Sequence, residues 1–436
     1  MSITVEHIVC PFCGCCCDDI EVTIENDRIT KAKNSCAIGS SKLLDYLSDR
    51  ETRPWIRRDG GRVEVSFQEA ADEAARILLN AKNPLLYGWS STCNEAQRVG
   101  VELAEKVGGV LDNTSSVCHG PTIEAVHDVG ESTSTLGQVR NRADLIVFWG
   151  CNPTQAHIRH LIRYSASSKG RFIPGRKERR VVVVDVRTTA TARTADLFLK
   201  VVPNQDYELI TALRMAVGFE EILDDEVAGV PVQQIEELAD LMMSCRFGAL
   251  LFGLGLTMTR GRERNVEAAI SLVRDLNKHT KFVLLPMRGH FNVTGANEVS
   301  TWLTGYPFAV DFNQGYPRYS PGENSSIELL SRETCDALFV VASDPASNFP
   351  RKIAESISRT PTVVVDPHLT PTAELSDVYI PTAAVGIEAE GTAYRMDGVP
   401  LPLRKLVDPP PGLPTDIEVL KMILSRIREF KGERAA

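Results

Sequence analysis

The chain has 436 residues, of which 43% are hydrophobic and 24% charged, and its formal net charge is −9. A chain of this length exceeds one hydrophobic core, so two or three lobes are expected. The acidic balance disfavours nucleic acid and anionic membranes as partners. No apolar run of about 18 residues occurs, which predicts no membrane span. The N-terminus lacks the pattern of a secretion signal, so we expect a cytoplasmic protein.

The eleven cysteines are unevenly distributed along the chain. Six lie in the first 36 residues, namely Cys10, Cys13, Cys15, Cys16, Cys17 and Cys36. The other five are scattered singly, as small buried side chains usually are. In a long intracellular chain, a cluster of thiols indicates a metal or iron–sulfur site rather than disulfides.

Four of the clustered cysteines have the spacing of cluster ligands. Cys10, Cys13 and Cys17 form C-x2-C-x3-C, and a hairpin predicted over 21–34 returns Cys36 to them. A structural zinc ribbon is the alternative to a [4Fe-4S] cluster. Zinc sites often contain two C-x2-C pairs, and the second pair is missing here, so the spacing favours iron–sulfur.

Cys15 and Cys16 are left over by this assignment. Cys16 in place of Cys17 would give C-x2-C-x2-C, so the third ligand stays open between these two residues, with Cys17 favoured. The surplus thiols are otherwise expected to lie buried beside the cluster.

Beyond residue 36, helical and strand-like segments alternate. Apolar residues at helical spacing predict helices at 66–81 (with Ser66 as N-cap), 94–109, 265–280 and 417–430. Short apolar runs bounded by Gly, Pro or polar residues predict strands at 84–91, 109–115, 143–153, 179–189, 248–257, 281–286, 335–345 and 360–367. Such alternation is typical of parallel sheets covered by helices on both faces.

The predicted fold class is α/β, with several Rossmann-like parallel-sheet lobes and a small N-terminal β lobe that carries the clustered cysteines. We predict an iron–sulfur lobe at 1–58 and an α/β lobe with a metal-ligand loop at 59–140. Two dinucleotide-binding parts are predicted at 141–330 and 331–436, the second ending in a helix.

Polar residues follow several predicted strands directly. The segments "WGCNP", "VDVRTT", "GLGLTMTRG" and "VASDP" each place Gly, Asn, Asp, Thr or Arg just beyond a strand's carboxyl end. Ligands bind at that edge in open α/β sheets, so a large polar ligand such as one or two nucleotides is indicated. Neither G-x-G-x-x-G nor a P-loop occurs, which argues against a simple NAD or ATP enzyme.

The clustered cysteines, the Rossmann-like lobes and a lone Cys118 resemble the molybdopterin oxidoreductases. The match narrows with "CPFCGCCCDDI", "LLYGWSSTCNEAQ", "SSVCHGPT", "WGCNPTQAHIRH", "PMRGHFNVTGANEVSTWLTGYPFAVDF" and "GIEAEGTAYRMDGVP". These blocks are similar to the catalytic B subunits of formylmethanofuran dehydrogenases over nearly the whole chain. The resemblance implies a [4Fe-4S] cluster and a tungsten or molybdenum ion held by two molybdopterin guanine dinucleotides; both metals take the same ligands.

The resemblance also implies roles for three side chains near the metal. Cys118 would ligate the ion, His119 would move a proton, and Arg288 would orient a carboxylate. Without the resemblance, the same residues would be a buried thiol, a structural histidine and a surface arginine. Lys42 is expected between the iron–sulfur cluster and a pterin, although its surroundings depart from the pattern of related formate dehydrogenases.

Loop chemistry and the resemblance together predict the contacts of the two dinucleotides. Asp206 would accept hydrogen bonds from a guanine edge, and the backbone around Gly253 and Gly255 would face phosphate. His290 and Asn292 are expected to be pterin-contacting or structural. The full predicted set is Asn152, Asp185, Arg187, Thr188, Thr191, Asp206, Gly253, Gly255, Thr257, Ser343 and Asp344.

The implied reaction is reversible reduction of CO2 to formate, within the formylmethanofuran dehydrogenase of methanogenesis. The resemblance implies a complex with an amidohydrolase-like A subunit, a C subunit, a pterin-capping D subunit and ferredoxin-type F and G subunits. Formate would pass through a tunnel to the A subunit for condensation with methanofuran. The D subunit would replace the C-terminal β-barrel cap of larger relatives, which we expect this chain to lack.

Two other functions remain as alternatives. A stand-alone formate dehydrogenase would use the same residues and pass electrons to a soluble carrier. A non-redox scaffold subunit of a formyltransferase/hydrolase complex would have lost the cluster cysteines and Cys118. All of those cysteines are present here, which disfavours the scaffold.

Overall fold

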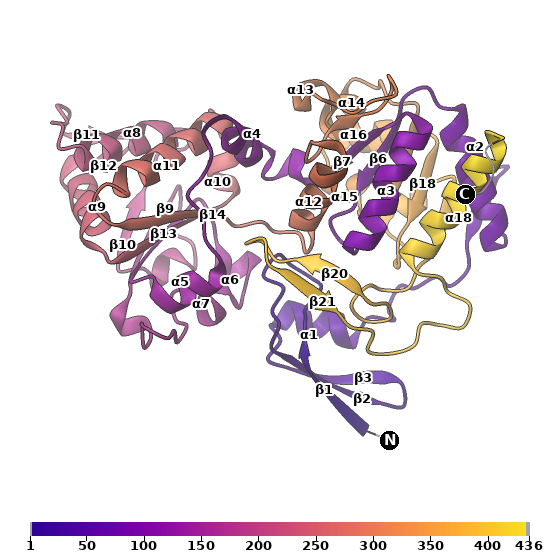
Figure 1. Cartoon of the computed structure of the whole chain (residues 1–436), viewed down its shortest axis with the longest axis horizontal. Helices are drawn as coiled ribbons and strands as arrows, with labels where there is room; N and C mark the ends of the chain where they lie inside the picture. Colours follow the sequence, from indigo (N-terminus) through magenta and orange to yellow (C-terminus); the bar gives the residue numbers. More distant parts are fainter. Residues whose placement is uncertain (1, 433–436) are drawn as a thin grey trace. The chain divides into compact units, whose positions relative to one another are not determined.

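A computed structural model describes residues 2–432 of the chain. They form two compact units (Figure 1). Unit 1 lies within 1–117, 290–395 and 400–436, and unit 2 within 118–289 and 396–399. Among the described residues, no helix is long and apolar enough to cross a membrane.

The N-terminal part of unit 1 is an antiparallel sheet. Its three strands lie side by side in chain order: β1 (Ser2–Ile8), β2 (Ile20–Glu25) and β3 (Arg28–Lys33). Asn26 and Asp27 have φ values of 51° and 60°, as the tight turn between β2 and β3 requires. The hairpin predicted over 21–34 is therefore confirmed. It is followed by α1 (Ala37–Leu44).

A nine-stranded sheet forms the centre of unit 1. Its spatial order is β16 (Arg318–Tyr319), β15 (Val310–Asp311), β7 (Val110–Asn113), β6 (Pro84–Gly88), β17 (Ala337–Val341), β18 (Thr362–Val365), β19 (Val378–Ile380), β4 (Trp55–Arg58) and β5 (Gly61–Glu64). The central strands from β7 to β19 are parallel, and the outer ones are antiparallel. Because β6 pairs with β17, distant parts of the chain share one sheet.

Helices cover both faces of this sheet. One face packs against α2 (Phe67–Asn80), α3 (Asn94–Val107), α12 (Val293–Thr304) and α18 (Asp416–Phe430). The other packs against α14 (Ser326–Ser331), α16 (Arg351–Ile357) and α17 (Pro371–Leu375). The remaining elements of unit 1 are η1 (Thr114–Val117), α13 (Pro321–Asn324), α15 (Pro345–Asn348) and the hairpin of β20 (Gly391–Tyr394) and β21 (Pro400–Leu403).

The ends of two helices confirm local signals in the sequence. Ser66 caps α2 in a reciprocal pair with Glu69, in which the Ser66 side chain accepts from the Glu69 N–H. Gly108 ends α3 with a φ of 68°, a conformation that glycine adopts without strain. The helices predicted at 66–81 and 94–109 therefore begin and end as the sequence indicates.

Unit 2 is built on a five-stranded parallel sheet. Its spatial order is β10 (Leu197–Lys200), β9 (Arg180–Asp185), β8 (Leu145–Trp149), β13 (Phe247–Phe252) and β14 (Lys281–Pro286). Figure 1 shows α8 (Asp206–Val217), α9 (Val232–Ser244) and α11 (Glu263–Leu276) over one face and α5 (Leu136–Arg142), α6 (Pro153–Ala156) and α7 (His160–Arg163) over the other. The other elements are α4 (Gly120–Val129), α10 (Leu254–Thr257), η2 (Arg176–Glu178), η3 (Ala192–Thr194) and the hairpin of β11 (Glu226–Val227) and β12 (Val230–Pro231).

Both units confirm the predicted fold class. Parallel strands are buried as short runs of Val, Ile, Leu and Phe, and the small β lobe precedes them. None of the sheets formed by residues 2–432 closes into a barrel. The predicted lobe boundaries stay a prediction.

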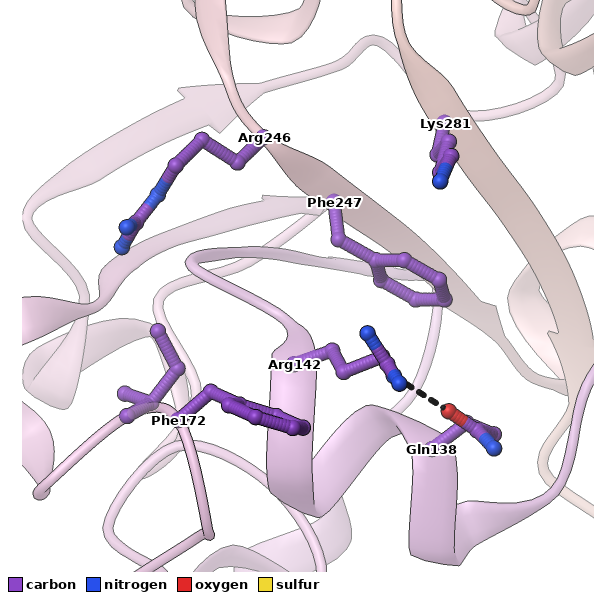
Figure 2. Close-up of a pocket in the computed structure, with 7 residues that line it drawn as sticks. Gln138, Arg142, Phe172, Arg246, Phe247 and Lys281 are labelled. Atoms are coloured by element: carbon purple, nitrogen blue, oxygen red, sulfur yellow. Dashed lines mark hydrogen bonds between the residues drawn. The ribbon is translucent and has the colours of Figure 1, made fainter.

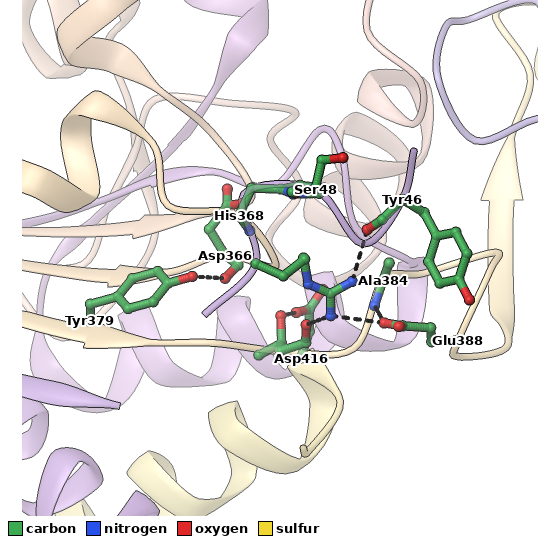
Figure 3. A network of polar contacts seen from close by, with 10 residues as sticks. Tyr46, Ser48, Asp366, His368, Tyr379, Ala384, Glu388 and Asp416 are labelled. Atoms are coloured by element: carbon green, nitrogen blue, oxygen red, sulfur yellow. Dashed lines mark hydrogen bonds and ion pairs between the residues drawn. The ribbon is translucent and has the colours of Figure 1, made fainter. Parts of the chain in front are cut away.

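A buried ion pair joins two segments of unit 1 (Figure 3). Arg50 Nη2 lies 2.9 Å from Glu388 Oε2, and the two side chains are 3% and 0% exposed. The Arg50 guanidinium also donates to the carbonyls of Tyr46 and Thr382, and Glu388 Oε2 accepts from the Ala384 N–H. A buried charge needs such partners, because burial without them costs several kcal/mol.

Arg50→Met is expected to lower the free energy of unfolding by about 3–5 kcal/mol, because it leaves the Glu388 carboxylate buried without its cation. The double variant with Glu388→Leu should recover much of that loss. Arg53→Met is the matched control, since Arg53 pairs with Glu64 at the surface, and it should cost less than about 1 kcal/mol. Thermal unfolding measures all three; equal losses for Arg50→Met and Arg53→Met would contradict the role of burial.

Asp366 lies in the same region, at the carboxyl end of β18 (Figure 3). Its Oδ1 accepts from the His368 N–H at 2.8 Å, and its carbonyl accepts from the Tyr379 hydroxyl at 3.0 Å. Burial raises the pKa of this carboxyl to about 7, and the nearby Asp416 and Asp344 act in the same direction. The folded chain therefore favours the protonated form of Asp366.

Because the pKa of Asp366 is higher in the folded than in the unfolded chain, stability should fall as pH rises between these two values. Asp366→Asn keeps an acceptor for the His368 N–H and removes this titration. From about pH 5 to about pH 7, the cofactor-free native chain should lose up to about 2 kcal/mol more than the variant. Unfolding in urea at several pH values measures the difference, and parallel curves would refute the assignment.

Candidate functional site

The clustered cysteines occupy a compact loop between β1 and β2. The Cys10 N–H donates to the Cys17 carbonyl at 2.9 Å, and the Cys16 N–H donates to the Cys13 carbonyl at 3.0 Å. Burial raises the pKa of Cys10, and its neighbours Cys13, Cys17 and Cys36 raise it further. The four predicted cluster ligands are thus close enough to interact.

Glycine keeps two of these thiols close together. Cys36 stands at the N-terminus of α1, and its Sγ accepts from the Gly39 N–H at 3.3 Å. A Cβ on Gly39 would lie 3.3 Å from Cys10 Sγ and 3.5 Å from Cys36 Sγ. A larger residue at this position would therefore clash with Ser35 Oγ, which would lie 2.7 Å away, and would press on Cys10 Sγ.

The two surplus thiols have different surroundings. Cys16 is fully buried with a φ of 37°, and its Sγ donates to the Phe291 carbonyl at 3.4 Å. Cys15 is also buried, and its hydrogen bond with Cys13 lowers the pKa of Cys13 to about 7. The Cys16 thiol is thus directed at a backbone carbonyl, and the choice of Cys17 over Cys16 as the third ligand stays a prediction.

Lys42 lies beside the cysteine loop. It stands on α1, with its Nζ 5.4 Å from the centre of the Phe12 ring. Its charge helps to lower the pKa of Cys13. Lys42 is thus placed to act on a cluster in this loop, and its contact with a pterin stays a prediction.

Cys118 lies in unit 2, just before α4. Its side chain is buried, and its carbonyl accepts from the Thr257 hydroxyl at 2.9 Å, which ties the Cys118 backbone to α10. Burial raises the pKa of the Cys118 thiol to about 11, while the Arg288 charge and the Gly289 N–H oppose that rise. Cys118 and Arg288 are therefore close enough to interact electrostatically.

His119 is held beside them in a neutral state. Its Nδ1 lies 3.0 Å from Thr122 Oγ1, and its ring meets the Phe252 ring edge-on at 5.7 Å. Burial lowers the pKa of His119 to about 3, and the Arg288 charge contributes. Its Nε2 is buried and forms no hydrogen bond of normal geometry, while the Met287 backbone opposes the fall in pKa; such a nitrogen can serve a bound group.

Arg288 follows β14, and its backbone is fixed by a histidine that the sequence analysis did not assign. His157 is buried, and its Nε2 lies 2.9 Å from the Arg288 carbonyl oxygen. Cys118, His119 and Arg288 are thus brought together at one place in unit 2. The signal for His157 was its position in the block "WGCNPTQAHIRH", a few residues beyond β8.

Polar side chains gather after β8 and β9 as predicted. Asn152 Oδ1 accepts from the Thr191 hydroxyl at 2.6 Å and from the Thr154 hydroxyl at 2.8 Å. Asp185 Oδ1 accepts from the Arg187 N–H at 3.3 Å, and burial raises the Asp185 pKa. Of the predicted dinucleotide contacts that follow β9, Arg187 and Thr188 are exposed.

Asp206 is the first residue of α8 and is buried. Its Oδ1 accepts from the Trp149 indole N–H at 2.8 Å, while its buried Oδ2 has no hydrogen-bond partner. Burial raises the pKa of this carboxyl. A buried acceptor of this kind fits a ligand that offers N–H donors, as a guanine edge does.

The amides of Gly253 and Gly255 do not have the role that the sequence suggested. The Gly253 N–H donates to the Trp149 carbonyl at 3.0 Å, and the Gly255 N–H donates to the Gly150 carbonyl at 2.9 Å. A Cβ on Gly255 would lie 2.6 Å from Gly150 Cα, so close backbone packing explains this glycine. These two amides therefore do not face a phosphate, and a cofactor contact by other atoms stays a prediction.

The hydrogen bonds between Asn152 and Thr191 recur in unit 1. Asp344 follows β17, and its Oδ1 accepts from the Thr372 N–H at 3.0 Å and from the Thr372 hydroxyl at 2.6 Å. Ser343, beside it, is half-buried. Thr372 was not among the predicted contacts, because its partnership with Asp344 joins two loops that are 28 residues apart in the sequence.

A separate concavity of about 420 Å³ lies at the amino edge of the unit 2 sheet (Figure 2). Phe247 and Lys281 line it from the first residues of β13 and β14. The Arg142 guanidinium lies 4.7 Å from the centre of the Phe172 ring and donates to Gln138 Oε1 at 2.8 Å. No predicted site residue lines this concavity, so it is distinct from the candidate site.

Comparisons with known proteins identify the family of this chain. The sequence model of the molybdopterin oxidoreductase family matches residues 50–426. The chain is 49% identical over 434 residues to the B subunit of the tungsten-containing formylmethanofuran dehydrogenase 2 of Methanocaldococcus jannaschii, covering 99% of this chain and 100% of that protein. It is 47% identical over 430 residues to the protein of the same name in Methanococcus maripaludis, covering 98% and 99%.

A solved structure shares the fold. It is a chain of the formyltransferase/hydrolase complex (FhcABCD) from Methylorubrum extorquens with methylofuran, with a TM-score of 0.71 and 23% identity, covering 87% of this chain and 100% of that chain. This likeness concerns the fold, whereas the family follows from the family model and from the two relatives matched over nearly the full length. The chain belongs to the molybdopterin oxidoreductase family, in the group formed by the B subunits of formylmethanofuran dehydrogenases.

Proposed function

We propose that this chain reduces CO2 to formate, reversibly, at a tungsten or molybdenum ion held by Cys118 and two molybdopterin guanine dinucleotides. The observation that carries the proposal is the grouping of Cys118, His119 and Arg288 in a chain so similar to redox B subunits. The names of those relatives favour tungsten.

The residues present fit these groups. The thiols of Cys10, Cys13, Cys17 and Cys36 form a soft donor set suited to a [4Fe-4S] cluster. Elsewhere in the chain, the unpartnered Oδ2 of Asp206 suits the N–H donors of guanine.

The two copies of the side-chain arrangement after β8 and β17 support two dinucleotides. The predicted contacts in unit 2 are assigned to one dinucleotide, and those of Ser343 and Asp344 to the other. Thr372 is added to this second set, because its hydrogen bonds with Asp344 match those of Thr191 with Asn152.

The chain's own side chains bind the substrate and handle its proton. When bound, the metal and its pterins supply a two-electron couple, and the iron–sulfur cluster supplies electrons singly. Conversion of CO2 to formate takes up two electrons and one proton. Arg288 holds the carboxylate through its guanidinium, and His119 moves the proton at Nε2, the ring nitrogen without a protein partner.

We infer that the chain works in a cytoplasmic complex of methanogenesis. Formate would pass to an amidohydrolase-like A subunit, where it condenses with methanofuran. A C subunit, a pterin-capping D subunit and ferredoxin-type F and G subunits complete the assembly. Relatives that are named as subunits of formylmethanofuran dehydrogenase support this inference.

Cys118→Ser tests the proposed metal ligand. In the anaerobically purified complex, tungsten or molybdenum should be lost and formate-dependent dye reduction should fall about 100-fold or more, because a hydroxyl is a poor ligand beside a soft thiolate. The iron content should stay unchanged. Cys245→Ser is the matched control, since this half-buried thiol donates to the Met242 carbonyl and is expected to leave both readouts unchanged.

Elemental analysis and dye reduction decide the outcome. Retention of tungsten or molybdenum with full activity in Cys118→Ser would refute the assignment. Zinc in the native complex, with neither iron nor a group-six metal, would leave the scaffold function as the better explanation.

Asp206→Asn tests the guanine contact. Asparagine keeps an oxygen acceptor for the Trp149 N–H but replaces the unpartnered Oδ2 by a donor, which repels the N–H groups of guanine. We expect less GMP to be released from the purified complex by acid hydrolysis, with the fold intact. Glu208→Gln, an exposed change on the same helix, is the control. Equal GMP yields from the two variants would argue against the contact.

A further inference from the structure

The segment after α8, residues 219–226, carries exposed apolar side chains and is called the acidic loop below. Leu223 is 87% exposed and Phe219 is 78% exposed. They are the two most exposed large apolar side chains among residues 2–432, and they lie four positions apart. Single exposed apolar residues are ordinary, but two so strongly exposed on one short loop indicate a contact surface.

The backbone of Phe219 adopts a conformation that disfavours its own side chain. Its φ is 59°, in the left-handed region where glycine usually stands after a helix. Backbone hydrogen bonds fix this geometry, from the Phe219 N–H to the Ala216 carbonyl at 3.1 Å and from the Glu220 N–H to the Met215 carbonyl at 2.9 Å. Gly218, one residue earlier, has a negative φ that any residue could adopt. The positive φ, which glycine would adopt without strain, falls instead on Phe219.

Negative charge surrounds the exposed pair. The acidic loop contains five carboxylates and neither lysine nor arginine: Glu220, Glu221, Asp224, Asp225 and Glu226. The hairpin of β11 and β12 closes it, with Ala228 and Gly229 at φ values of 54° and 81° in the turn. The loop is therefore a short, well-anchored element that presents two apolar side chains within an acidic rim.

A hollow of about 530 Å³ adjoins the Phe219 ring and is lined by the C-terminal ends of α8 and α11. The ring meets the His279 ring edge-on at 5.7 Å there, yet remains largely exposed. The nearby cations Arg214 and Lys278 are both paired with Asp275. The hollow is thus lined largely by polar side chains that already have partners, and the Phe219 ring at its rim is left open to solvent.

We propose that the acidic loop is the contact surface for another subunit of the complex, one with an apolar pocket for Phe219 and Leu223 rimmed by lysine or arginine. Charge complementarity argues for a basic partner, because opposite charges steer the encounter and like charges reject wrong partners. An anionic membrane is disfavoured for the same reason. This inference rests on the proposed function, in which the chain works inside a multi-subunit assembly.

Hydroxyl-radical footprinting tests the contact, because it measures the exposure of individual side chains. Oxidation of Phe219 and Leu223 is compared between the isolated chain and the purified native complex. We expect both residues to be readily oxidised in the isolated chain and oxidised about tenfold more slowly in the complex. Equal oxidation in the two samples would overturn the proposal.

A paired variant adds a measurement of assembly. Phe219→Gly with Leu223→Ser removes both apolar contacts and relieves the backbone at position 219, so the isolated chain should unfold at the same or a higher temperature. The affinity of the chain for the remaining subunits should fall at least about tenfold. The loss should be larger at high salt, because the variant then depends on charge interactions that salt screens. Phe172→Ala, which removes an exposed phenylalanine elsewhere in unit 2, is the control and should not alter assembly.

The other outcomes separate this proposal from the function itself. A second copy of this chain is the competing occupant, since its concavity near Arg142 and Lys281 is basic and aromatic (Figure 2). Concentration-dependent protection of the loop in the isolated chain would identify that occupant and overturn our proposal. An active complex with a fully oxidised loop would overturn the contact alone, whereas absence of any co-purifying subunit would count against both.

Discussion

Parallel strand pairing is the constraint on which the candidate site depends. Because the strands of the unit 2 sheet all run the same way, the loops after β8, β9, β13 and β14 begin at one edge of that sheet. The same constraint acts in unit 1, where β17 and β18 end together. The hydrogen bonds that Asn152 makes with Thr191, and Asp344 with Thr372, tie each pair of neighbouring loops into a fixed shape. A large ligand at such an edge meets a rigid surface rather than separate flexible loops.

Burial then determines the chemical state of the side chains at that edge. Desolvation lowers the pKa of His119 to about 3, so its ring is neutral in the cofactor-free chain. Arg288 keeps its charge and acts on both Cys118 and His119, which makes it the dominant charge among these three residues. A cationic guanidinium beside a buried thiol and a neutral imidazole suits an anionic bound group. Burial also makes the atoms without a hydrogen-bond partner, His119 Nε2 and Asp206 Oδ2, destabilising in the free chain. A ligand that forms hydrogen bonds with them would remove this cost in folding free energy.

Local features were predictable from the sequence, and long-range pairing was not. The hairpin turn at Asn26 and Asp27, the capping box of α2 and the strand-to-loop junctions all follow from neighbouring residues. By contrast, β6 lies beside β17, and Arg50 pairs with Glu388, through contacts that no local pattern encodes. The phosphate role of the Gly253 and Gly255 amides was expected from a glycine pattern, but close packing against Gly150 also produces that pattern. His157 was missed because its contact is with the backbone carbonyl of Arg288, which the position of His157 just beyond β8 does not reveal.

The surplus cysteines are explained in part by the segment that follows Arg288. Asn292 is fully buried, and its amide donates to the Thr92 carbonyl and to Asn94 Oδ1 while its Oδ1 accepts from the Tyr394 N–H. This residue therefore fixes the start of α12 within unit 1, in the structural role that was one of its two predicted alternatives. Cys16 adds a thiol hydrogen bond to the carbonyl of the preceding residue, which connects the cysteine loop to the same segment. A small, weakly polar thiol suits a fully buried position of this kind, because it behaves as a small apolar side chain with a weak S–H donor. One cysteine beyond the proposed cluster ligands thus has a structural explanation that requires no metal.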